Sequence, residues 1–205
     1  MKTEVYAGAA ILAVALGVGA GLYLTRGSGD DQFAQCRNGT VAGGDIGGPF
    51  TLTSGKGETV TDQDVLSKPA IIYFGYTFCP DVCPLDTVRN ADAAAILDER
   101  GYDVTPIFIT IDPKRDTPEA VDDFTANIYD KMVGLTGTEE QIAAVADAYK
   151  VYYKAHDAEE DEFYLVDHST YSYMTLPGQG FVDFFRRDNT AEEIADTAAC
   201  YIDNA

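Results

Sequence analysis

Two cysteines in a proline-flanked segment are the residues of this chain best suited to chemistry. Cys79 and Cys83 stand four residues apart in the sequence CPDVCP, where a helix is expected to begin. On a helical turn, side chains with this spacing lie on one face with Cβ atoms about 5–6 Å apart, so both sulfurs can reach one metal ion. The same spacing also suits a disulfide, whose Cα atoms are roughly 4.4–6.8 Å apart, so the pair can instead be a redox switch.

The helix start is expected to influence the reactivity of these cysteines. Pro84 suits the first helical position, which would place Cys83 at the cap, where free N–H groups and the helix dipole favour a thiolate. Asp81, between the cysteines, is expected to cap the turn, or alternatively to tune the thiolates or a metal electrostatically. A structural disulfide or two buried small side chains are the alternatives for the cysteine pair. Its position directly after a predicted central strand favours a functional site.

His168 is a candidate third ligand. It stands in the sequence Asp167-His168-Ser169 between two predicted strands. A lone histidine is more often structural, but if the strands and helices of the domain form a thioredoxin-like fold, this loop faces the cysteine loop. Two thiolates and an imidazole suit copper, because soft sulfur favours Cu(I) and nitrogen helps to hold Cu(II), whereas zinc usually takes a fourth ligand. His156, beside an acidic segment, is expected to be exposed.

Cys36 and Cys200 flank the domain that follows the N-terminal segment. Four cysteines in an extracytoplasmic protein make a second pair plausible, and these two would tie the start of the domain to its last helix. The sequence does not give their Cα separation, so it leaves open whether they are bonded.

The cysteine segment must be positioned by a strand before it and a helix after it. Residues 70–76 form a near-continuous apolar and aromatic run, typical of a central strand buried on both faces of a largely parallel sheet. Residues 85–100 are expected to form a helix with an apolar stripe. That stripe consists of Leu85, Val88, Ala91, Ala95 and Leu97.

The rest of the domain alternates strands and helices. We expect strands at 104–111, 163–166, 171–176 and 181–185, and helices from Pro118 to about Tyr129, at 138–150 and after Thr190. Thr117 and Thr190 are the expected N-caps of two of these helices. A hairpin formed by 50–52 and 59–61 precedes them, and 157–162 is expected to be a solvated loop. The pattern predicts an α/β, thioredoxin-like fold with an N-terminal hairpin extension.

The N-terminal segment has a different character. Residues 6–25 carry no charge, and roughly 20 apolar residues can cross a hydrocarbon core of about 30 Å. The run exceeds a signal-peptide core and no clear A-x-A site follows, so we expect an uncleaved single transmembrane helix. The expected organisation is a membrane anchor at 1–26, a linker at 27–35 and one domain at 36–205.

Composition limits the partners that this domain can bind. An apolar content of 46% is enough for one packed core. The formal net charge is −20, and nucleic acids are bound by Lys and Arg that neutralise phosphates, so we expect no nucleic-acid partner.

Four segments together resemble a known family. They are GYTFCPDVCP at 75–84, IDPKRDT at 111–117, YKVYY at 149–153 and VDHS at 166–169. In this order they resemble the SCO/SenC family of cytochrome c oxidase copper-assembly proteins, over roughly 45–202. The resemblance implies a thioredoxin-like fold, a single-pass anchor in the inner membrane, and a domain on the periplasmic side or in the mitochondrial intermembrane space.

The resemblance also implies a function. The family's copper ligands fall on Cys79, Cys83 and His168, with one copper per chain, and its inter-cysteine aspartate on Asp81. The implied role is to deliver copper, received from a copper-donating chaperone, to the binuclear copper A centre of cytochrome c oxidase subunit II. The alternatives are a thiol-disulfide reductase with Cys79 and Cys83 as its redox pair, and a redox or copper sensor. Thioredoxins carry a cis-proline where this chain has 167–170 without proline, which favours metal binding over general disulfide exchange.

Overall fold

The computed structural model describes residues 32–37, 45–156 and 163–205. The expected anchor at 1–26 and the expected acidic loop at 157–162 therefore lie outside the described residues. Among those that are described, none of the helices is long and apolar enough to span a membrane. The chain divides into two units, 1–34 and 35–205, and the fold is that of the second unit.

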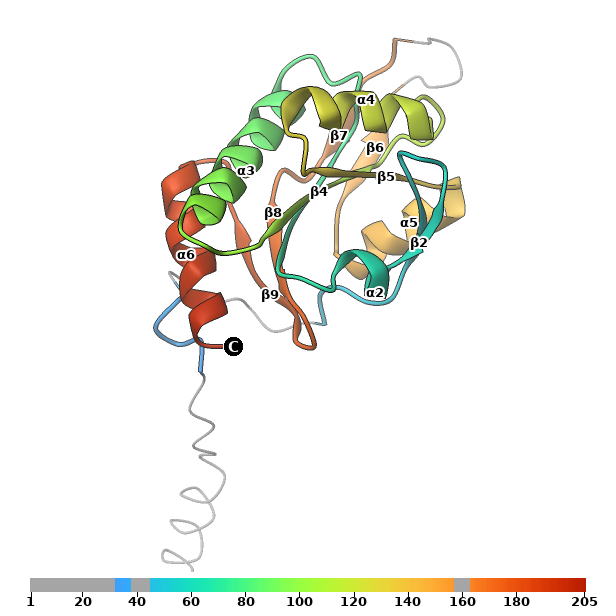
Figure 1. The fold of residues 1–205 in the computed structure, drawn as a ribbon. Coiled ribbons are helices and arrows are strands. Elements are labelled where there is room, and N and C mark those ends of the chain that lie inside the picture. Colours follow the sequence, from blue (N-terminus) through green and yellow to red (C-terminus); the bar gives the residue numbers. More distant parts are fainter. Residues whose placement is uncertain (1–31, 38–44, 157–162) are drawn as a thin grey trace, which may run out of the picture. The chain divides into compact units, whose positions relative to one another are not determined.

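The described part of this unit is built on a seven-stranded mixed sheet with the strand order β2-β1-β5-β4-β3-β8-β9 (Figure 1). The three central strands, β3, β4 and β5, are parallel, and the outer strands join them antiparallel. The sheet strands are β1 (Thr51–Ser54), β2 (Thr59–Thr61), β3 (Ala70–Gly75), β4 (Thr105–Thr110), β5 (Val133–Thr136), β8 (Ser172–Leu176) and β9 (Gly180–Phe185). A separate two-stranded ribbon consists of β6 (Tyr153–Ala155) and β7 (Val166–His168). The β1–β2 pair is the predicted hairpin, and the domain is mixed α/β as predicted.

Helices cover both faces of the sheet (Figure 1). They are α2 (Asp62–Val65), α3 (Val82–Glu99), α4 (Pro118–Ile128), α5 (Glu139–Ala148) and α6 (Ala191–Asp203). Successive side chains of a strand point to opposite faces, and β3 shows this clearly. The side chain of Tyr73 contacts Phe108 and points to the face covered by α3. The side chain of Phe74 points to the other face, where it contacts Tyr173 and Tyr149, the residue directly after α5. All six residues of β3 are buried, so the strand before the cysteine segment is held on both faces.

The helix starts agree with their cap signals. Thr117 and Thr190 are N-caps as predicted, and their hydroxyls accept hydrogen bonds from the backbone N–H groups of Ala120 and Glu193. Side chains that satisfy these first N–H groups fix where a helix begins.

The predicted apolar stripe on α3 is wrong at its first two positions. The helix begins at Val82, not 85, and residues Leu85 and Val88 are 62% and 42% exposed. The face turned inward begins with Cys83, Asp86, Thr87 and Asn90, all buried. Asp86, Thr87 and Asn90 form hydrogen bonds inside the domain, so these polar side chains can be buried. The buried face of α3 therefore follows from these hydrogen bonds and not from the number of apolar residues on each face.

The surroundings of His168 also differ from the prediction. His168 is the last residue of strand β7 and pairs with Tyr153 of β6, instead of standing in a loop between two strands. The strand β6 was not predicted, because three residues are too few to show a period of two.

The start of the domain is covalently joined to its last helix. Cys36 and Cys200 form a disulfide with a Cα–Cα separation of 5.6 Å across 164 residues of sequence. This bond closes most of the domain into one loop.

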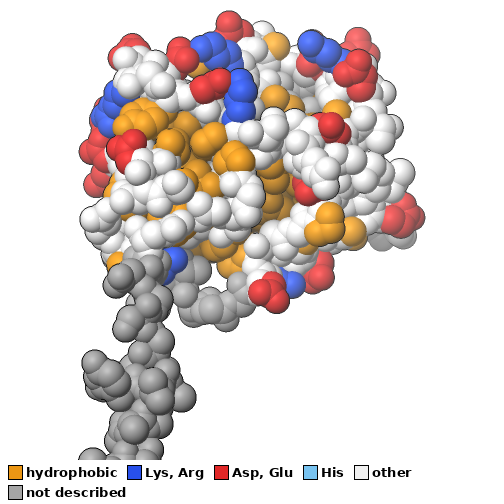
Figure 2. All heavy atoms as spheres, turned by 60° about the horizontal axis from the view of Figure 1, so that its bottom comes forward, with side chains coloured by type: hydrophobic (Ala, Val, Ile, Leu, Met, Phe, Trp, Pro, Cys, Tyr) orange, Lys and Arg blue, Asp and Glu red, His pale blue; other side chains and the backbone are white. Residues whose placement is uncertain are grey.

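The end of the domain drawn lowest in Figure 1 carries hydrophobic side chains gathered between charged ones (Figure 2). A cleft of about 510 Å³ lies beside α2 and the start of β9, and its apolar lining includes Ile46, Pro49, Leu66 and Phe181. The cysteine segment is not part of this cleft: it follows the carboxyl end of β3.

Candidate metal centre

The structure brings Cys79, Cys83 and His168 into one cluster whose ligand atoms all lie within 4.8 Å of one another. Cys79 precedes α3, Cys83 lies in the first turn of α3, and His168 ends β7. Both cysteines are buried and are free thiols. Thiolates and imidazoles bind metals at about 2.0–2.3 Å, so two ligands of one ion are at most about 4.6 Å apart. The cluster therefore needs only small movements to hold an ion.

Hydrogen bonding fixes the tautomer of His168. Its Nδ1 lies 2.8 Å from the carbonyl oxygen of Ser169, and a carbonyl can only accept, so Nδ1 carries the proton. The lone pair is then on Nε2, which lies 3.3 Å from Sγ of Cys83. A backbone carbonyl that orients the other ring nitrogen is the usual arrangement of a metal-binding histidine.

Burial keeps this imidazole neutral. It lowers the pKa of His168, and the contribution of burial exceeds the opposing contributions of the Ser169 carbonyl and nearby carboxylates. The rings of Tyr73 and Tyr76 pack roughly perpendicular to the imidazole, with centroid distances of 6.2 and 5.9 Å. His168 is therefore held in place as an uncharged candidate ligand.

The two thiols are not equivalent. Burial alone would raise the pKa of Cys79, but hydrogen bonds from Cys83 and from the N–H groups of Asp81, Cys83 and Val82 outweigh it, so the pKa is lowered. The N–H of Cys83 lies 3.3 Å from Sγ of Cys79. Free N–H groups at a helix start favour negative charge, so Cys79 is the more thiolate-like sulfur.

The predicted thiolate at Cys83 is wrong. Burial raises the pKa of Cys83, and its hydrogen bond with Cys79 adds to the rise. The reason is the early start of α3: with Asp81 at the N-cap position, Cys83 and Pro84 are already inside the first turn. The sulfur that faces the free N–H groups is consequently that of Cys79.

Asp81, and not Cys83, stands at the N-cap position of α3, but its side chain does not cap the turn as predicted. It is exposed, and its side chain makes no capping hydrogen bond with the described residues. Its backbone N–H contributes to the site, because its hydrogen bond to Cys79 helps to lower the pKa of that thiol.

A buried carboxylate that the sequence analysis missed anchors the cysteine segment. Both oxygens of Asp116 accept hydrogen bonds: Oδ2 from the backbone N–H of Thr77 and the hydroxyl of Thr110, and Oδ1 from the hydroxyl of Thr77. Burial raises the pKa of Asp116. This residue ties the segment after β3 to the loop after β4.

An arginine on the same loop adds a second anchor. The guanidinium of Arg115 donates to Asp112 at 2.6 Å and lies 3.6 Å from the ring centroid of Tyr164 and 4.9 Å from that of Phe78. Cation–π contacts of this kind join the cysteine segment to the chain that leads into β7. The signal for both anchors was present in the sequence as the motif at 111–117.

The end of β3 requires glycine. A Cβ at Gly75 would stand 2.9 Å from the ring of Tyr73, 3.0 Å from that of Phe108 and 3.1 Å from Sγ of Cys83. The first distance is shorter than real Cβ contacts and the other two are unusually tight, so a side chain at Gly75 would require the Tyr73 ring and its neighbours, the Cys83 sulfur among them, to shift.

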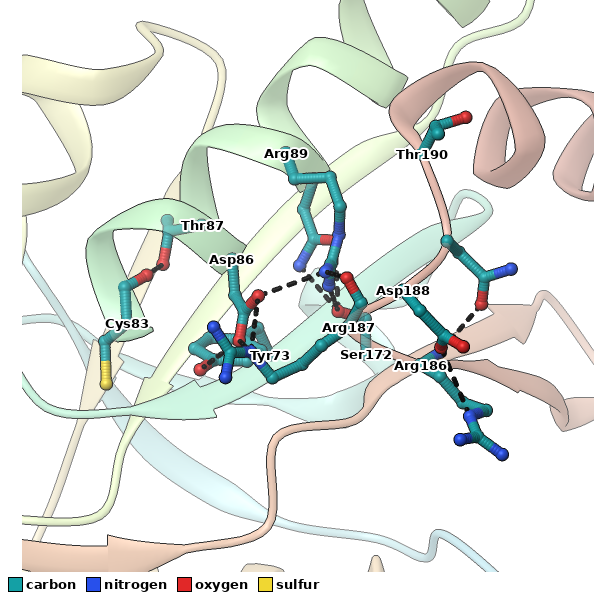
Figure 3. Close-up of polar contacts among 12 residues, drawn as sticks. Tyr73, Cys83, Asp86, Thr87, Arg89, Ser172, Arg186, Arg187, Asp188 and Thr190 are labelled. Atoms are coloured by element: carbon teal, nitrogen blue, oxygen red, sulfur yellow. Dashed lines mark hydrogen bonds and ion pairs between the residues drawn. The ribbon is translucent and has the colours of Figure 1, made fainter. Parts of the chain in front are cut away.

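A polar network behind the site was also missed (Figure 3). Asp86 is buried on α3 and accepts hydrogen bonds from the Tyr73 hydroxyl at 3.1 Å and from Arg89 at 3.0 Å. Arg187, after β9, forms an ion pair with it at 3.2 Å. Asn90, one turn along α3 from Asp86, is hydrogen-bonded to Ser172 of β8. The sequence signal was the spacing of Cys83, Asp86 and Asn90, which places them on one helix face.

The remaining candidate residues lie outside the cluster. His156 is exposed as predicted and contacts Asp167 at 2.7 Å. The thiols of Cys36 and Cys200 are consumed in their disulfide and are not available as ligands.

The domain is thioredoxin-like, and two free thiols and an oriented imidazole meet beyond the carboxyl end of β3. These features define the class of protein: a thioredoxin-like domain with a candidate metal site of two sulfurs and one nitrogen. Comparisons with known proteins identify the family: the chain matches the SCO1/SenC family over residues 38–203 and belongs to it. It is 50% identical over 203 residues to protein SenC of Rhodobacter capsulatus, covering 98% of this chain and 91% of SenC.

Two further comparisons agree with this family membership. The chain is 43% identical over 159 residues to the mitochondrial SCO1 homolog of mouse; the match covers 77% of this chain but 56% of the mouse protein, so this chain spans little more than half of that relative. It is similar to the crystal structure of Arabidopsis thaliana ScoI with copper bound, with a TM-score of 0.73 and 38% identity, over 78% of this chain and 99% of that one.

Proposed function

We propose that this protein is a copper-binding assembly factor that carries one copper ion on Cys79, Cys83 and His168. The observation that carries the proposal is the cluster itself, with three ligand atoms within 4.8 Å of one another and Nε2 of His168 free of its proton. Two sulfurs and one imidazole nitrogen match the ligand preferences of copper. Relatives solved with copper bound support this choice of metal.

Copper is cargo in this proposal and leaves by ligand exchange. Loading Cu(I) displaces the proton of Cys83, whereas Cys79 is the more thiolate-like sulfur before loading. A partner's thiolates or imidazoles then replace the three ligands one at a time, and each departing thiolate takes up a proton. Copper keeps its oxidation state throughout, so no reductant is needed.

The proposed recipient is the binuclear copper A centre of cytochrome c oxidase subunit II, and a copper-donating chaperone supplies the ion. We further propose an anchor at 1–26, a linker at 27–35 and a domain at 36–205. The anchor would hold the domain on the periplasmic side of the inner membrane, where the disulfide between Cys36 and Cys200 suits an oxidising compartment.

Copper loading of the domain from residue 30 onward tests the proposal. The reduced wild type is expected to bind one copper per chain, and Cu(II) should give thiolate charge-transfer bands. A wild-type protein that retains no copper after desalting would rule out the carrier role.

The unequal thiols favour a second candidate, a thiol-disulfide reductase. Cys79 as thiolate would attack a target disulfide and form a mixed disulfide, releasing one target thiolate. Cys83, once deprotonated, would then attack Cys79, so that the target gains two electrons and this pair becomes a disulfide. A Cys83→Ser variant should trap the mixed disulfide with subunit II if this role is real. A sensor role uses the same residues and would require a signalling partner.

A further inference from the structure

A second cleft lies beside the candidate metal centre, on the side of His168. It measures about 510 Å³, and its lining includes His168, Tyr171, Arg186 and Arg187. The two arginines directly follow β9 and Tyr171 directly precedes β8, so these three residues come from the ends of two paired strands. The cleft therefore brings a candidate copper ligand and two adjacent guanidinium groups to one hollow of the surface.

The lining of the cleft is positive on an otherwise acidic protein. It contains two arginines and one carboxylate, that of Asp188, whereas the whole chain has 14 basic and 34 acidic residues and a net charge of −20. The carboxylate of Asp167 lies on the other face of β7 from His168, because neighbouring residues of a strand point to opposite faces, and it contacts His156 at 2.7 Å. The cleft is therefore a place where this surface can accept negative charge.

Arg187 is held in the cleft by a buried carboxylate (Figure 3). Its Nε forms an ion pair with Oδ2 of Asp86 at 3.2 Å, and the Asp86 side chain is 3% exposed, whereas that of Arg187 is 45% exposed. Arg89 also pairs with Asp86 and donates a hydrogen bond to the backbone carbonyl of Arg187 at 2.9 Å. Two arginines thus share one carboxylate, so the group carries a net positive charge, and the Arg187 guanidinium needs little ordering to bind a ligand.

Arg186 adds a second, exposed guanidinium. Its Nε pairs with Asp188 at 3.2 Å, and the two side chains are 69% and 74% exposed. Exposed ion pairs contribute little to stability, so Asp188 is a weak competitor for an incoming carboxylate. Both Arg186 and Arg187 make their ion pairs through Nε. A guanidinium has five N–H donors, so its Nη groups can bind a further carboxylate with two parallel hydrogen bonds.

Exposed apolar side chains accompany these charges. Tyr171 is 43% exposed on the lining of the cleft and packs against Phe184 with a centroid distance of 5.0 Å. Leu85 is 62% exposed on α3, and its spacing of four residues from Arg89 places the two side chains next to each other on the helix. Protein interfaces are enriched in tyrosine and arginine and combine an apolar centre with a polar rim. The surroundings of the cleft therefore suit a protein partner better than a small anion.

We propose that this cleft is the docking site for an acidic segment of the protein that exchanges copper with this chain, and that a carboxylate of the partner binds Arg187 and Arg186 beside His168. Because the rest of the surface is acidic, the cleft fixes the orientation of the partner and brings the partner's copper ligands next to the cluster. The copper-exchanging partner rests on the proposed function, whereas the cleft and its charge are independent of it.

A blocked tetraglutamate peptide tests the cleft without copper, and the matching tetraglutamine peptide is its neutral counterpart. In amide NMR titrations of the copper-free domain, only the glutamate peptide should shift the backbone signals of residues 168–171 and 186–188. Arg186→Glu should weaken the binding of this peptide by several-fold. Asp188→Asn removes the competing carboxylate and should strengthen it, which a purely structural role of these residues does not predict.

The control variant is Arg100→Glu. Arg100 forms a similar exposed ion pair with Asp196, but it lies at the other end of α3 from the cysteines, so this variant should bind the peptide as wild type does. Arg186 is substituted in preference to Arg187, whose loss would leave the buried Asp86 with one partner fewer. Peptide shifts that Arg186→Glu leaves unchanged overturn the proposal. Citrate that binds as tightly as the peptide also overturns it, because the cleft would then be a small-anion site.

Copper transfer tests the partner. Transfer from the Cu(I)-loaded protein to the copper-free copper A domain of subunit II should be about tenfold slower for Arg186→Glu than for wild type at low salt. The two rates should converge at high salt, where charges are screened, and Arg100→Glu should match wild type throughout. Equal rates for all three proteins overturn the docking role. A wild type that binds or transfers no copper instead refutes the carrier function, and the peptide titration then decides whether the cleft accepts an acidic segment.

Discussion

The imidazole of His168 presents Nε2 to Sγ of Cys83 across 3.3 Å, and the carbonyl of Ser169 holds its other nitrogen at 2.8 Å. Because the carbonyl of Ser169 orients the ring, the imidazole can serve as a copper ligand with little further ordering. We expect His168→Ala to lower copper affinity by at least about 100-fold, since even a lost partner of a ligand typically costs 10–100-fold. Competition with a chromophoric copper chelator measures this. His156→Ala removes the exposed histidine instead and should match wild type.

The lowered pKa of His168 predicts a dependence of stability on pH. The unfolded chain binds a proton at this residue near pH 6.5, whereas burial makes the folded protein bind it only at lower pH. The stability that comes from the neutral imidazole is therefore present above about pH 6.5 and is lost as the pH falls through the folded pKa. Urea unfolding of the copper-free domain from pH 7.5 downward should show this loss in wild type and a smaller one in His168→Gln. Parallel pH profiles for the two proteins would contradict the assignment.

The two thiols should react in a fixed order. The lowered pKa of Cys79 and the raised pKa of Cys83 predict that limiting iodoacetamide at pH 7 alkylates Cys79 first. Peptide mapping by mass spectrometry identifies the modified residue. Preferential labelling of Cys83 would show that the helix start activates that residue after all.

A methyl group at the end of β3 should disturb the site directly. Gly75→Ala places a Cβ 3.1 Å from the Cys83 sulfur and closer still to two aromatic rings, and overpacking of this kind costs about 1–3 kcal/mol. We expect a lower unfolding free energy together with weakened copper binding. Gly48→Ala is the control, because its nearest neighbour would be the Ala148 Cβ at an ordinary 3.7 Å.

Removing the disulfide should affect stability and leave the cluster unchanged. Loss of a native disulfide typically costs about 2–5 kcal/mol, so Cys36→Ser with Cys200→Ser should lower the melting temperature. Copper stoichiometry should remain that of wild type, since neither cysteine belongs to the cluster. A change in stoichiometry would indicate that these cysteines take part in binding.

Much of the architecture follows from local signals. Strand β3 and the starts of α4 and α6 could be predicted from a few residues each. A continuous apolar run indicates a strand buried on both faces, and a threonine cap marks the start of a helix, so both signals are local. The α3 stripe was mispredicted because Leu85 and Val88 look like core residues, whereas the buried face is chosen by long-range partners such as Ser172. No period in the sequence reveals those partners.

The candidate site likewise combines features that local sequence signals predict with features that depend on long-range contacts. The cysteine spacing and the position of His168 pointed to a shared ion, but the order of thiol reactivity depends on where α3 begins, which differs from expectation by a few residues. The roles of Tyr73, Asp86 and Asp116 arise from contacts between segments 13 to 39 residues apart, and only the folded chain reveals them.

The bond between Cys36 and Cys200 makes the domain a closed covalent ring. A single cut of the backbone anywhere between these two cysteines leaves both pieces attached to each other. Protease-treated protein will therefore migrate as one species on a non-reducing gel even when its chain is broken, and only reduction will release the fragments. The disulfide also means that a mechanical force applied to the chain before Cys36 is transmitted to α6 through covalent bonds, without passing through any strand of the sheet.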